Sequence, residues 1–454
     1  MTRLTAAFAG QSLMARVLRS ASWMLIGQGG SHALRLISNL LLTRLLFPEA
    51  FGLMALVSMV IIGLALFSDV GIGPSIQQNE RGDDPDFLNT AWTIQVVRGF
   101  ILWSGTLAMA WPVAQFYGEP DLALYLPLAG VSLVIAGFNP TRIETANRHL
   151  LVGRLTVLDL ISQILGIVAM VVLALTFKSV MALVMGGVVQ ALVKLALCHF
   201  YLPGPANRFR WERKAGKELI RFGKWIFLST AFYFATSQGD RAILGKFVSL
   251  ETLGLYNIGF FLASFPSLLG AAITQRLLIP VYREKPAGQA PENARKLRLL
   301  RAGMTTTILS MVLAIALTGP WLVGFLYDDR YLLSGPMTVV ISISLIPSVI
   351  GLTYDQAALA AGDSRTFFVF TATRAILQTG LFVLGVMQFG LIGGIGAVGL
   401  SMLLAYPVLI WLARKHQSWD PLHDLLFGMI GAGGALLALW LHMDQITALL
   451  TDLS

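Results

Sequence analysis

Long apolar runs separated by short polar breaks fill almost the whole chain. The first half predicts helices over residues 21–43, 51–73, 88–112, 122–143, 155–176 and 179–200. The second half predicts helices over 222–244, 253–276, 300–326, 334–358, 366–388 and 391–413, and a thirteenth run covers 423–441. Because about 20 apolar residues in a helix cross the hydrocarbon core of a bilayer, this pattern predicts a polytopic, all-α membrane protein.

The two halves resemble each other at a constant spacing. The segment RLLFPEAFGLMAL follows the first run, and KFVSLETLGLYNI follows the seventh, so that Glu49 and Gly52 recur as Glu251 and Gly254. Each copy holds six runs, an even number, and both copies therefore begin on the same side of the membrane. We expect two lobes related by an axis along the membrane normal, as in transporters whose site lies between repeated halves.

The same pattern divides the chain into five segments. They are an amphipathic N-terminus (1–20), a first six-helix lobe (21–200), a basic linker (201–221), a second six-helix lobe (222–413), and an extra helix with a tail (414–454). The first apolar run lasts to about Leu46, which is too long for a cleaved signal peptide.

Positive charge marks one side of the predicted membrane protein. Most of the 33 Lys and Arg residues fall in alternate connections between the runs, above all in the linker and after the eighth run. Because basic loops face the cytoplasm, we expect a cytoplasmic N-terminus. The formal net charge of +9 then reflects topology and attraction to anionic lipid headgroups, and it requires no nucleic acid.

Composition supports the assignment to a membrane protein and argues against several kinds of cofactor, metal and enzymatic site. Hydrophobic residues make up 56% and charged residues 13% of the chain, whereas soluble domains carry about 25% charged residues. The single cysteine, Cys198, excludes an intrachain disulfide and a cysteine-based metal cluster. The chain contains neither a GxxxxGK[ST] phosphate-binding loop nor an HExxH motif. We therefore expect no cofactor, no metal and no enzymatic activity.

Polar side chains inside the predicted helices are the candidate substrate contacts. His32, Arg35 and Asn39 are spaced to share one face of the first helix. An arginine near the bilayer centre costs at least about 2.5–3.5 kcal/mol, so Arg35 should face a wet cavity or a partner. Two interpretations stay open: a structural pair with Asp69 or another acid, and a contact with an anionic substrate. The other cavity candidates are Arg98, Asp69, Asp240, Arg241 and Arg374.

Cations outnumber acids among the buried residues, which favours an anionic headgroup over a cationic drug. The matching face of the seventh helix carries Phe234, Ser237 and Arg241, so the polar stripe is not repeated there. For residues near the cytoplasmic helix ends, we expect loop structure or gating ion pairs. These residues are Glu144, Arg148, Asp159 and Asp355.

With its two matching turns and its 6+6 layout, the chain resembles Wzx-type polysaccharide flippases. These belong to the polysaccharide-transport branch of the multidrug/oligosaccharidyl-lipid/polysaccharide (MOP) exporter superfamily. The resemblance covers about residues 15–415, and the turn marks the fold rather than the substrate. It implies two six-helix, MATE-like lobes around a central cavity. The thirteenth run departs from a twelve-helix plan.

The resemblance also implies a function. An undecaprenyl-diphosphate-linked oligosaccharide would pass, by alternating access, from the cytoplasmic to the periplasmic leaflet of a bacterial inner membrane. The implied partners are this glycan, membrane lipids, and a polymerase with a chain-length regulator of the same pathway. Substrate residues vary within the family, so the candidates above rest on depth and charge.

Three other classes predict different features. A MATE-like, ion-coupled drug or cation antiporter shares the fold but should have a more acidic cavity. A polysaccharide polymerase or ligase should have a large outward loop, whereas the outward turns here are short. A membrane O-acetyltransferase needs a buried histidine with partners, and only His32 lies well inside a predicted helix.

Overall fold

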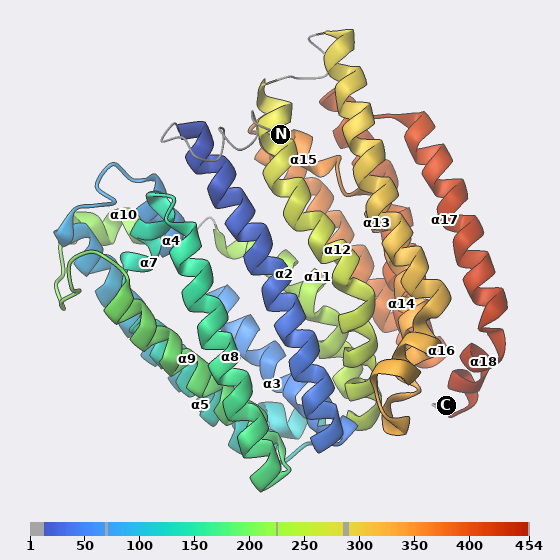
Figure 1. The fold of residues 1–454 in the computed structure, drawn as a ribbon, viewed down its shortest axis with the longest axis horizontal. Coiled ribbons are helices and arrows are strands. Elements are labelled where there is room, and N and C mark those ends of the chain that lie inside the picture. Colours follow the sequence, from blue (N-terminus) through green and yellow to red (C-terminus); the bar gives the residue numbers. More distant parts are fainter. Residues whose placement is uncertain (1–12, 69–70, 224–225, 285–289, 453–454) are drawn as a thin grey trace. The chain divides into compact units, whose positions relative to one another are not determined.

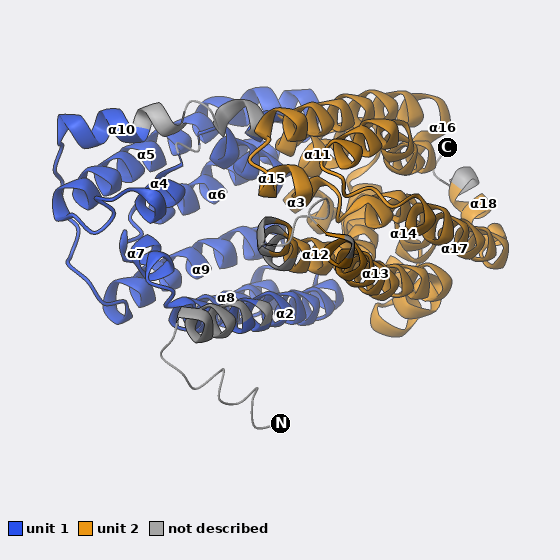
Figure 2. Cartoon of the chain, turned by 90° about the horizontal axis from the view of Figure 1, so that it is seen from above, with its two compact units in different colours: residues 1–46, 56–231 blue, residues 47–55, 232–454 orange. Residues whose placement is uncertain are grey.

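The computed structural model describes residues 13–68, 71–223, 226–284 and 290–452, and these form helices and turns without any β-strand. They divide into two compact units (Figure 2): unit 1 contains residues 1–46 and 56–231, and unit 2 contains residues 47–55 and 232–454. Within the described ranges, nine helices are long and apolar enough to cross a membrane, or ten if one bent pair counts as a span. The chain is a multi-pass membrane protein.

Unit 1 is built from long helices and three short ones (Figure 1). The long helices are α2 (Leu13–Leu45), α5 (Pro85–Tyr117), α6 (Leu122–Gly137), α8 (Val152–Phe177) and α9 (Val180–Tyr201), with part of α3 (Pro48–Phe67). The short helices are α4 (Ile72–Gln78), α7 (Arg142–Arg148) and α10 (Arg213–Gly223). Helix α8 packs against both α2 and α9, and α5 packs against α6.

Two predicted helices of unit 1 are broken. The run over 122–143 forms α6 and α7, which meet at an angle of 60°. Pro140 lies in the break, and because proline disfavours helical backbone at the preceding residue, the helix ends before it. The run over 51–73 forms α3, which ends at Phe67, and α4 begins at Ile72 after Gly71 in a left-handed conformation (φ 64°).

Unit 2 contains the other spans. Its helices are most of α11 (Ile226–Phe247), then α12 (Leu250–Glu284), α13 (Pro291–Leu326), the 3₁₀ turn η2 (Asp329–Tyr331), α14 (Ser334–Gly351), α15 (Asp355–Ala360), α16 (Ser364–Lys415), α17 (Pro421–Leu441) and α18 (Met443–Asp452). Helix α14 is the centre of this unit, since it is largely buried and packs against α12, α13, α16 and α17. The thirteenth predicted run is α17, which lies against α13 and α14.

Helix α16 contains two predicted spans in one element. Its 52 residues would extend about 78 Å if straight, far more than the roughly 30 Å of a hydrocarbon core. The helix instead turns at Phe389 and Gly390, where Gly390 has φ 61° and ψ −153°, a backbone conformation open to glycine. A Cβ on Gly385 would lie 2.4 Å from the carbonyl oxygen of Gly393, so the two arms pack backbone against backbone.

The matching turns of the two repeats meet inside unit 2. A Cβ placed on Gly52 of α3 would lie 1.9 Å from the carbonyl oxygen of Leu250, and one on Gly254 of α12 would lie 1.9 Å from that of Pro48. These contacts are reciprocal and join equivalent positions of the repeat. Only glycine fits at either position while the backbones remain this close.

The basic segment after α9 is held against unit 1 and ends in a helix. The Arg81 guanidinium binds the two carboxylate oxygens of Glu212 at 3.0 and 2.6 Å, and it also binds Asp84 at 2.6 Å. Ala215 and Leu219 of α10 are fully buried in an apolar cluster with residues of α4 and α5. The amphipathic α10 therefore lies on unit 1 as a fixed element.

The substitution Gly52→Ala tests the crossing of the two turns. A methyl group there must displace a backbone carbonyl, so we expect destabilisation of at least about 1–3 kcal/mol. The measurement is the thermal unfolding temperature in detergent. Gly433→Ala on α17, where a Cβ meets nothing within 4 Å, is the control and should leave that temperature unchanged. Equal unfolding temperatures for both variants would contradict the contact.

The Arg81 contacts predict how docking of the basic segment depends on pH. Hydrogen bonds from Arg81 hold the pKa of Glu212 below its ordinary value, and the Asp86 backbone N–H and Arg81 lower the pKa of Asp84. A carboxyl group whose pKa is lower in the docked state than in the unfolded chain stabilises docking at pH values above its unfolded pKa. This stabilisation is lost as the pH falls through the pKa of the docked state. The fluorescence of Trp211 should stay constant from pH 8 to 5 and change only below about pH 4. In Arg81→Gln the change should occur at higher pH, and an unshifted transition would contradict this account.

Candidate functional site

The predicted polar stripe lies on α2 in unit 1. The Arg35 side chain is exposed, whereas His32 and Asn39 are half-buried. Among the described residues, no acid forms an ion pair with Arg35, and Asp69, its suggested partner, lies outside them. The carbonyl of the neighbouring Ser31 accepts a hydrogen bond from Gln163 of α8 at 3.1 Å. This stretch of α2 is thus fixed on α8 and leaves a guanidinium accessible.

Arg98 of α5 binds the end of a neighbouring helix. Its Nε donates to Ser68 Oγ at 2.9 Å, and its Nη2 donates to the Ala65 carbonyl at 2.6 Å. The last carbonyls of a helix lack intrahelical partners and carry partial negative charge, so a cation is favoured there. Arg98 therefore ties α5 to the C-terminal turn of α3.

Asp240 and Arg241 come together in unit 2 with residues that the sequence analysis missed. Asp240 is only 8% exposed and accepts a hydrogen bond from Tyr256 at 2.6 Å. Arg241 Nη1 lies 3.3 Å from Asp240, its Nε donates to Asn257 at 3.2 Å, and its guanidinium lies 4.6 Å from the centre of the Phe260 ring. All three missed partners lie on α12, and a buried ion pair needs such additional partners.

Arg374 of α16 faces a second acid of unit 2. Its Nη2 donates to Ser348 at 3.4 Å, and its charge is attracted to that of Asp355. The buried Nε of Arg374 has no hydrogen-bond partner among the described residues. One turn later, Gln378 donates to the Thr236 carbonyl of α11 at 3.1 Å. The Gln378 bond joins α16 to α11, while Arg374 keeps one buried donor without a partner among the described residues.

The predicted gating residues of unit 1 form local ties. Glu144 accepts a hydrogen bond from Gln77 at 2.8 Å. Arg148 donates to the carbonyls of Ile76, Gln77 and Asn79, and its Nε lies 3.2 Å from Asp83. Asp159 pairs with Lys194 at 2.8 Å and so links α8 to α9. The arrangement around α4 and α7 holds two short helices together.

A buried polar network near the start of α17 carried no signal in the sequence analysis. Arg301, only 3% exposed, donates to Thr353 at 3.0 Å and to the Tyr282 hydroxyl at 2.9 Å. Its guanidinium lies 4.3 Å from the ring centre of Tyr354, whose hydroxyl donates to Asp424 at 2.7 Å. The network connects α12, α13 and α17. Arg301 lies at the start of the predicted helix 300–326, next to a basic connection where a cation is expected, so nothing in the sequence singled it out.

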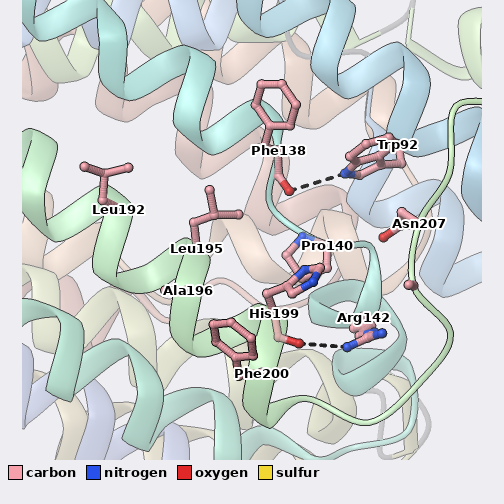
Figure 3. Close-up of a pocket in the computed structure, with 11 residues that line it drawn as sticks. Trp92, Phe138, Pro140, Arg142, Leu192, Leu195, Ala196, His199, Phe200 and Asn207 are labelled. Atoms are coloured by element: carbon pink, nitrogen blue, oxygen red, sulfur yellow. Dashed lines mark hydrogen bonds between the residues drawn. The ribbon is translucent and has the colours of Figure 1, made fainter.

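A cavity of about 420 Å³ lies in unit 1 among α5, α9 and the segment after α9 (Figure 3). Trp92, Phe138 and Phe200 line it with aromatic rings, and Leu192, Leu195 and Ala196 of α9 also face it. Apart from the His199 imidazole, the polar side chains of its wall bind neighbouring groups. Trp92 Nε1 donates to the Phe138 carbonyl at 3.3 Å, Arg142 donates to the His199 carbonyl at 2.9 Å, and Asn207 donates to Thr141 at 2.8 Å. The surface that remains is largely apolar.

The described residues offer no metal centre, since no three His, Cys, Asp or Glu side chains among them are grouped to hold an ion. What they do offer is an accessible guanidinium on α2 of unit 1 and, in unit 2, the Asp240–Arg241 pair of α11 and the buried Arg374 of α16. The exposed Arg35 guanidinium is suited to contact with a polar or anionic ligand.

Comparisons with known proteins show which proteins the chain and its fold resemble. The chain is 22% identical over 386 residues to the succinoglycan biosynthesis transport protein ExoT of Rhizobium meliloti (strain 1021), covering 83% of this chain and 76% of that protein. The fold matches the lipid II flippase MurJ in an inward closed conformation, with a TM-score of 0.66 and 12% identity over 93% of this chain and 99% of MurJ. It also matches an inward-facing multidrug resistance MATE family transporter of the MOP superfamily, with a TM-score of 0.63 and 16% identity over 92% and 98% of the two chains.

These matches confirm the expected all-α, MATE-like fold. A family model described as polysaccharide biosynthesis protein matches residues 41–336. That range includes both matching turns, the basic segment and the cavity of unit 1. It covers more than half of the sequence, and the chain therefore belongs to the polysaccharide biosynthesis protein family.

Proposed function

We propose that the protein is a flippase that moves a lipid-linked oligosaccharide from the cytoplasmic to the periplasmic leaflet of a bacterial inner membrane. The observation that carries this proposal is the family match over residues 41–336 in a chain with the fold of MOP transporters. The resemblance to ExoT and MurJ supports the same class of activity. The substrate in this proposal is an undecaprenyl-diphosphate-linked repeat unit for exopolysaccharide, capsule or O-antigen assembly.

The physical task is to move sugars and a diphosphate past hydrocarbon while the lipid tail stays in it. A charged group at the bilayer centre needs water or a partner, so the path must supply one. Arg35 is suited to this role because its guanidinium is exposed and no described acid pairs with it. Guanidinium binds phosphate oxygens through two parallel hydrogen bonds. We assign Arg35 to the diphosphate or to an acidic sugar, with His32 and Asn39 on the same helix face.

The proposed orientation follows from the basic connections. A cytoplasmic N-terminus places the segment after α9 and the connection between α12 and α13 on the cytoplasmic side, as positive-inside topology requires. The chain has no ATP-binding motif of the P-loop type. An ion gradient or consumption of the glycan on the far side would then drive transport. A polymerase and a chain-length regulator of the same pathway are the partners that would consume it.

A cation or drug antiporter of the MATE type is the alternative with the same fold. It would require an acid that is free to bind a cation. The described acid on α11, Asp240, is instead bound by Tyr256 and Arg241. The engagement of this carboxylate favours the flippase.

Replacing Arg35 by Gln tests the site within the proposed function. Loss of a charge-assisted hydrogen bond of about 1.5–3 kcal/mol should lower export about ten- to a hundredfold. The measurement is polymer production in a deletion strain that expresses each variant, with protein level measured in parallel. Arg44→Gln at the exposed end of the same helix is the control and should export normally.

Two results separate the site from the function. Normal polymer production by Arg35→Gln at normal protein level would remove Arg35 from the substrate path but leave the flippase assignment intact. If the deletion strain accumulated no lipid-linked repeat units, the flippase assignment itself would be wrong.

A further inference from the structure

We propose that the cavity of unit 1 binds one acyl chain of an anionic phospholipid, and that the basic segment beside it holds the headgroup. The cavity is formed entirely by residues of unit 1: Trp92 of α5, Phe138 after α6, the C-terminal half of α9, and Asn207 (Figure 3). This site is independent of the transported substrate. It rests on the orientation proposed above, in which the segment after α9 lies at the cytoplasmic surface.

The chemistry of the wall selects hydrocarbon. Trp92 Nε1, the Arg142 guanidinium and the Asn207 amide already bind Phe138, His199 and Thr141. A ligand in the cavity therefore meets aromatic rings and aliphatic groups, and it gains by removing their apolar surface from water. A polar ligand would find few groups besides the His199 imidazole to replace its hydrogen bonds to water.

The neighbourhood of the cavity is that of a membrane interface. Leu192 and Phe200 of α9 line the cavity and are 48% and 78% exposed, as expected for a helix that faces lipid. The Trp92 ring also lies 4.7 Å from that of Phe209, which is 65% exposed, and Trp211 is exposed two residues later. Aromatic side chains gather where hydrocarbon meets headgroups. The cavity thus opens to a ligand whose tail is apolar and whose head lies near this aromatic group.

Charge next to the cavity selects an anionic head. Arg208 follows Asn207 directly, is exposed, and its guanidinium bonds no described residue. Arg210 is 2.8 Å from Asp86, while the exposed Lys214 and Lys217 continue the basic surface onto α10. A zwitterionic headgroup gains less from this surface than an anionic one, because basic residues near a membrane attract negative lipids.

The size of the cavity favours a phospholipid chain over the polyprenyl chain of the proposed substrate. A volume of about 420 Å³ lies at the lower end of the roughly 300–1,000 Å³ of small-ligand pockets. One acyl chain fits such a space, whereas a long polyprenyl chain far exceeds it. The occupant is therefore a lipid of the surrounding bilayer.

The test uses full-length protein in nanodiscs of phosphatidylcholine with a minor fraction of phosphatidylglycerol that carries brominated acyl chains. Bromine quenches tryptophan emission at contact. The emission of Trp92 is the difference between the emission of wild type and that of Trp92→Phe. Trp103 lies on the same helix but does not face the cavity, and its emission is obtained in the same way from Trp103→Phe. We expect quenching of Trp92 at a lipid fraction that leaves Trp103 unquenched. Brominated phosphatidylcholine at the same fraction should not quench Trp92.

Two variants separate the tail site from the head site. Ala196→Phe fills the cavity and should abolish the quenching of Trp92, whereas Met185→Phe, on α9 but not facing the cavity, should leave it unchanged. Arg208→Gln leaves the cavity intact and should weaken phosphatidylglycerol binding about fivefold, the effect of one basic residue near an anionic surface. Because the Arg208 side chain is exposed, its replacement should not unfold the protein, and a change in lipid binding would not result from loss of folding.

Three outcomes overturn the proposal. Equal quenching of Trp92 by both brominated lipids would mean contact with bulk lipid only. Quenching that survives Ala196→Phe would place the bromine outside the cavity. Quenching by brominated undecaprenyl phosphate but not by brominated phosphatidylglycerol would assign the cavity to the polyprenyl lipid instead.

Discussion

The constraint on which this structure depends is that helix ends in or near a membrane must find hydrogen-bond donors for their last carbonyls. Unit 1 meets it three times with arginine. Arg98 binds the Ala65 carbonyl at the end of α3, and Arg148 binds the carbonyls of Ile76, Gln77 and Asn79 at the end of α4. Arg142 binds the carbonyls of His199 and Leu202 at the end of α9. Each guanidinium supplies donors and a positive charge to the negative end of a helix.

This use of arginine explains why the charges of unit 1 differ in availability. An arginine that satisfies carbonyls at a helix end cannot leave them without exposing unpaired acceptors, each of which costs about 1–3 kcal/mol when buried. Arg98, Arg142 and Arg148 are therefore committed to the fold. Arg35 lies within α2, where the backbone carbonyls already accept hydrogen bonds from the same helix. Its guanidinium is therefore not needed to satisfy a helix end. The positions of these arginines relative to the predicted helices distinguish Arg35 from the other three less clearly than their contacts in the structure do.

The apolar pattern predicted the spans because helix formation in hydrocarbon leaves few alternatives: every backbone group must bond within its own segment. The paired arms of α16 and the late helix α17 both follow from it. The break between α6 and α7 did not follow from it. Pro140, with Asn139 and Thr141 beside it, lies inside the predicted helix 122–143, and a pattern of apolar runs does not record where a helix kinks. Pairings such as Arg81 with Glu212, or Arg301 with Tyr282, join residues that are distant in the chain. They depend on how helices pack, which no local pattern records. The same holds for the cavity, whose wall combines three separate segments.

The crossing at Gly52 and Gly254 explains which part of the repeat remains legible in the sequence. Each glycine meets a backbone oxygen of the other copy, so both positions require the absence of a side chain, while the residues that supply those oxygens, Pro48 and Leu250, need not match. A contact between equivalent positions constrains both copies in the same way. Residues away from this contact are constrained only by their own neighbours, and there the two copies differ. Helix α2 carries His32, Arg35 and Asn39, whereas α11 carries Arg241 in a buried pair with Asp240. The repeat therefore persists in sequence where equivalent backbones touch. It diverges where the first helix of each copy carries different polar residues, and we propose that a substrate that is not itself symmetric is recognised there.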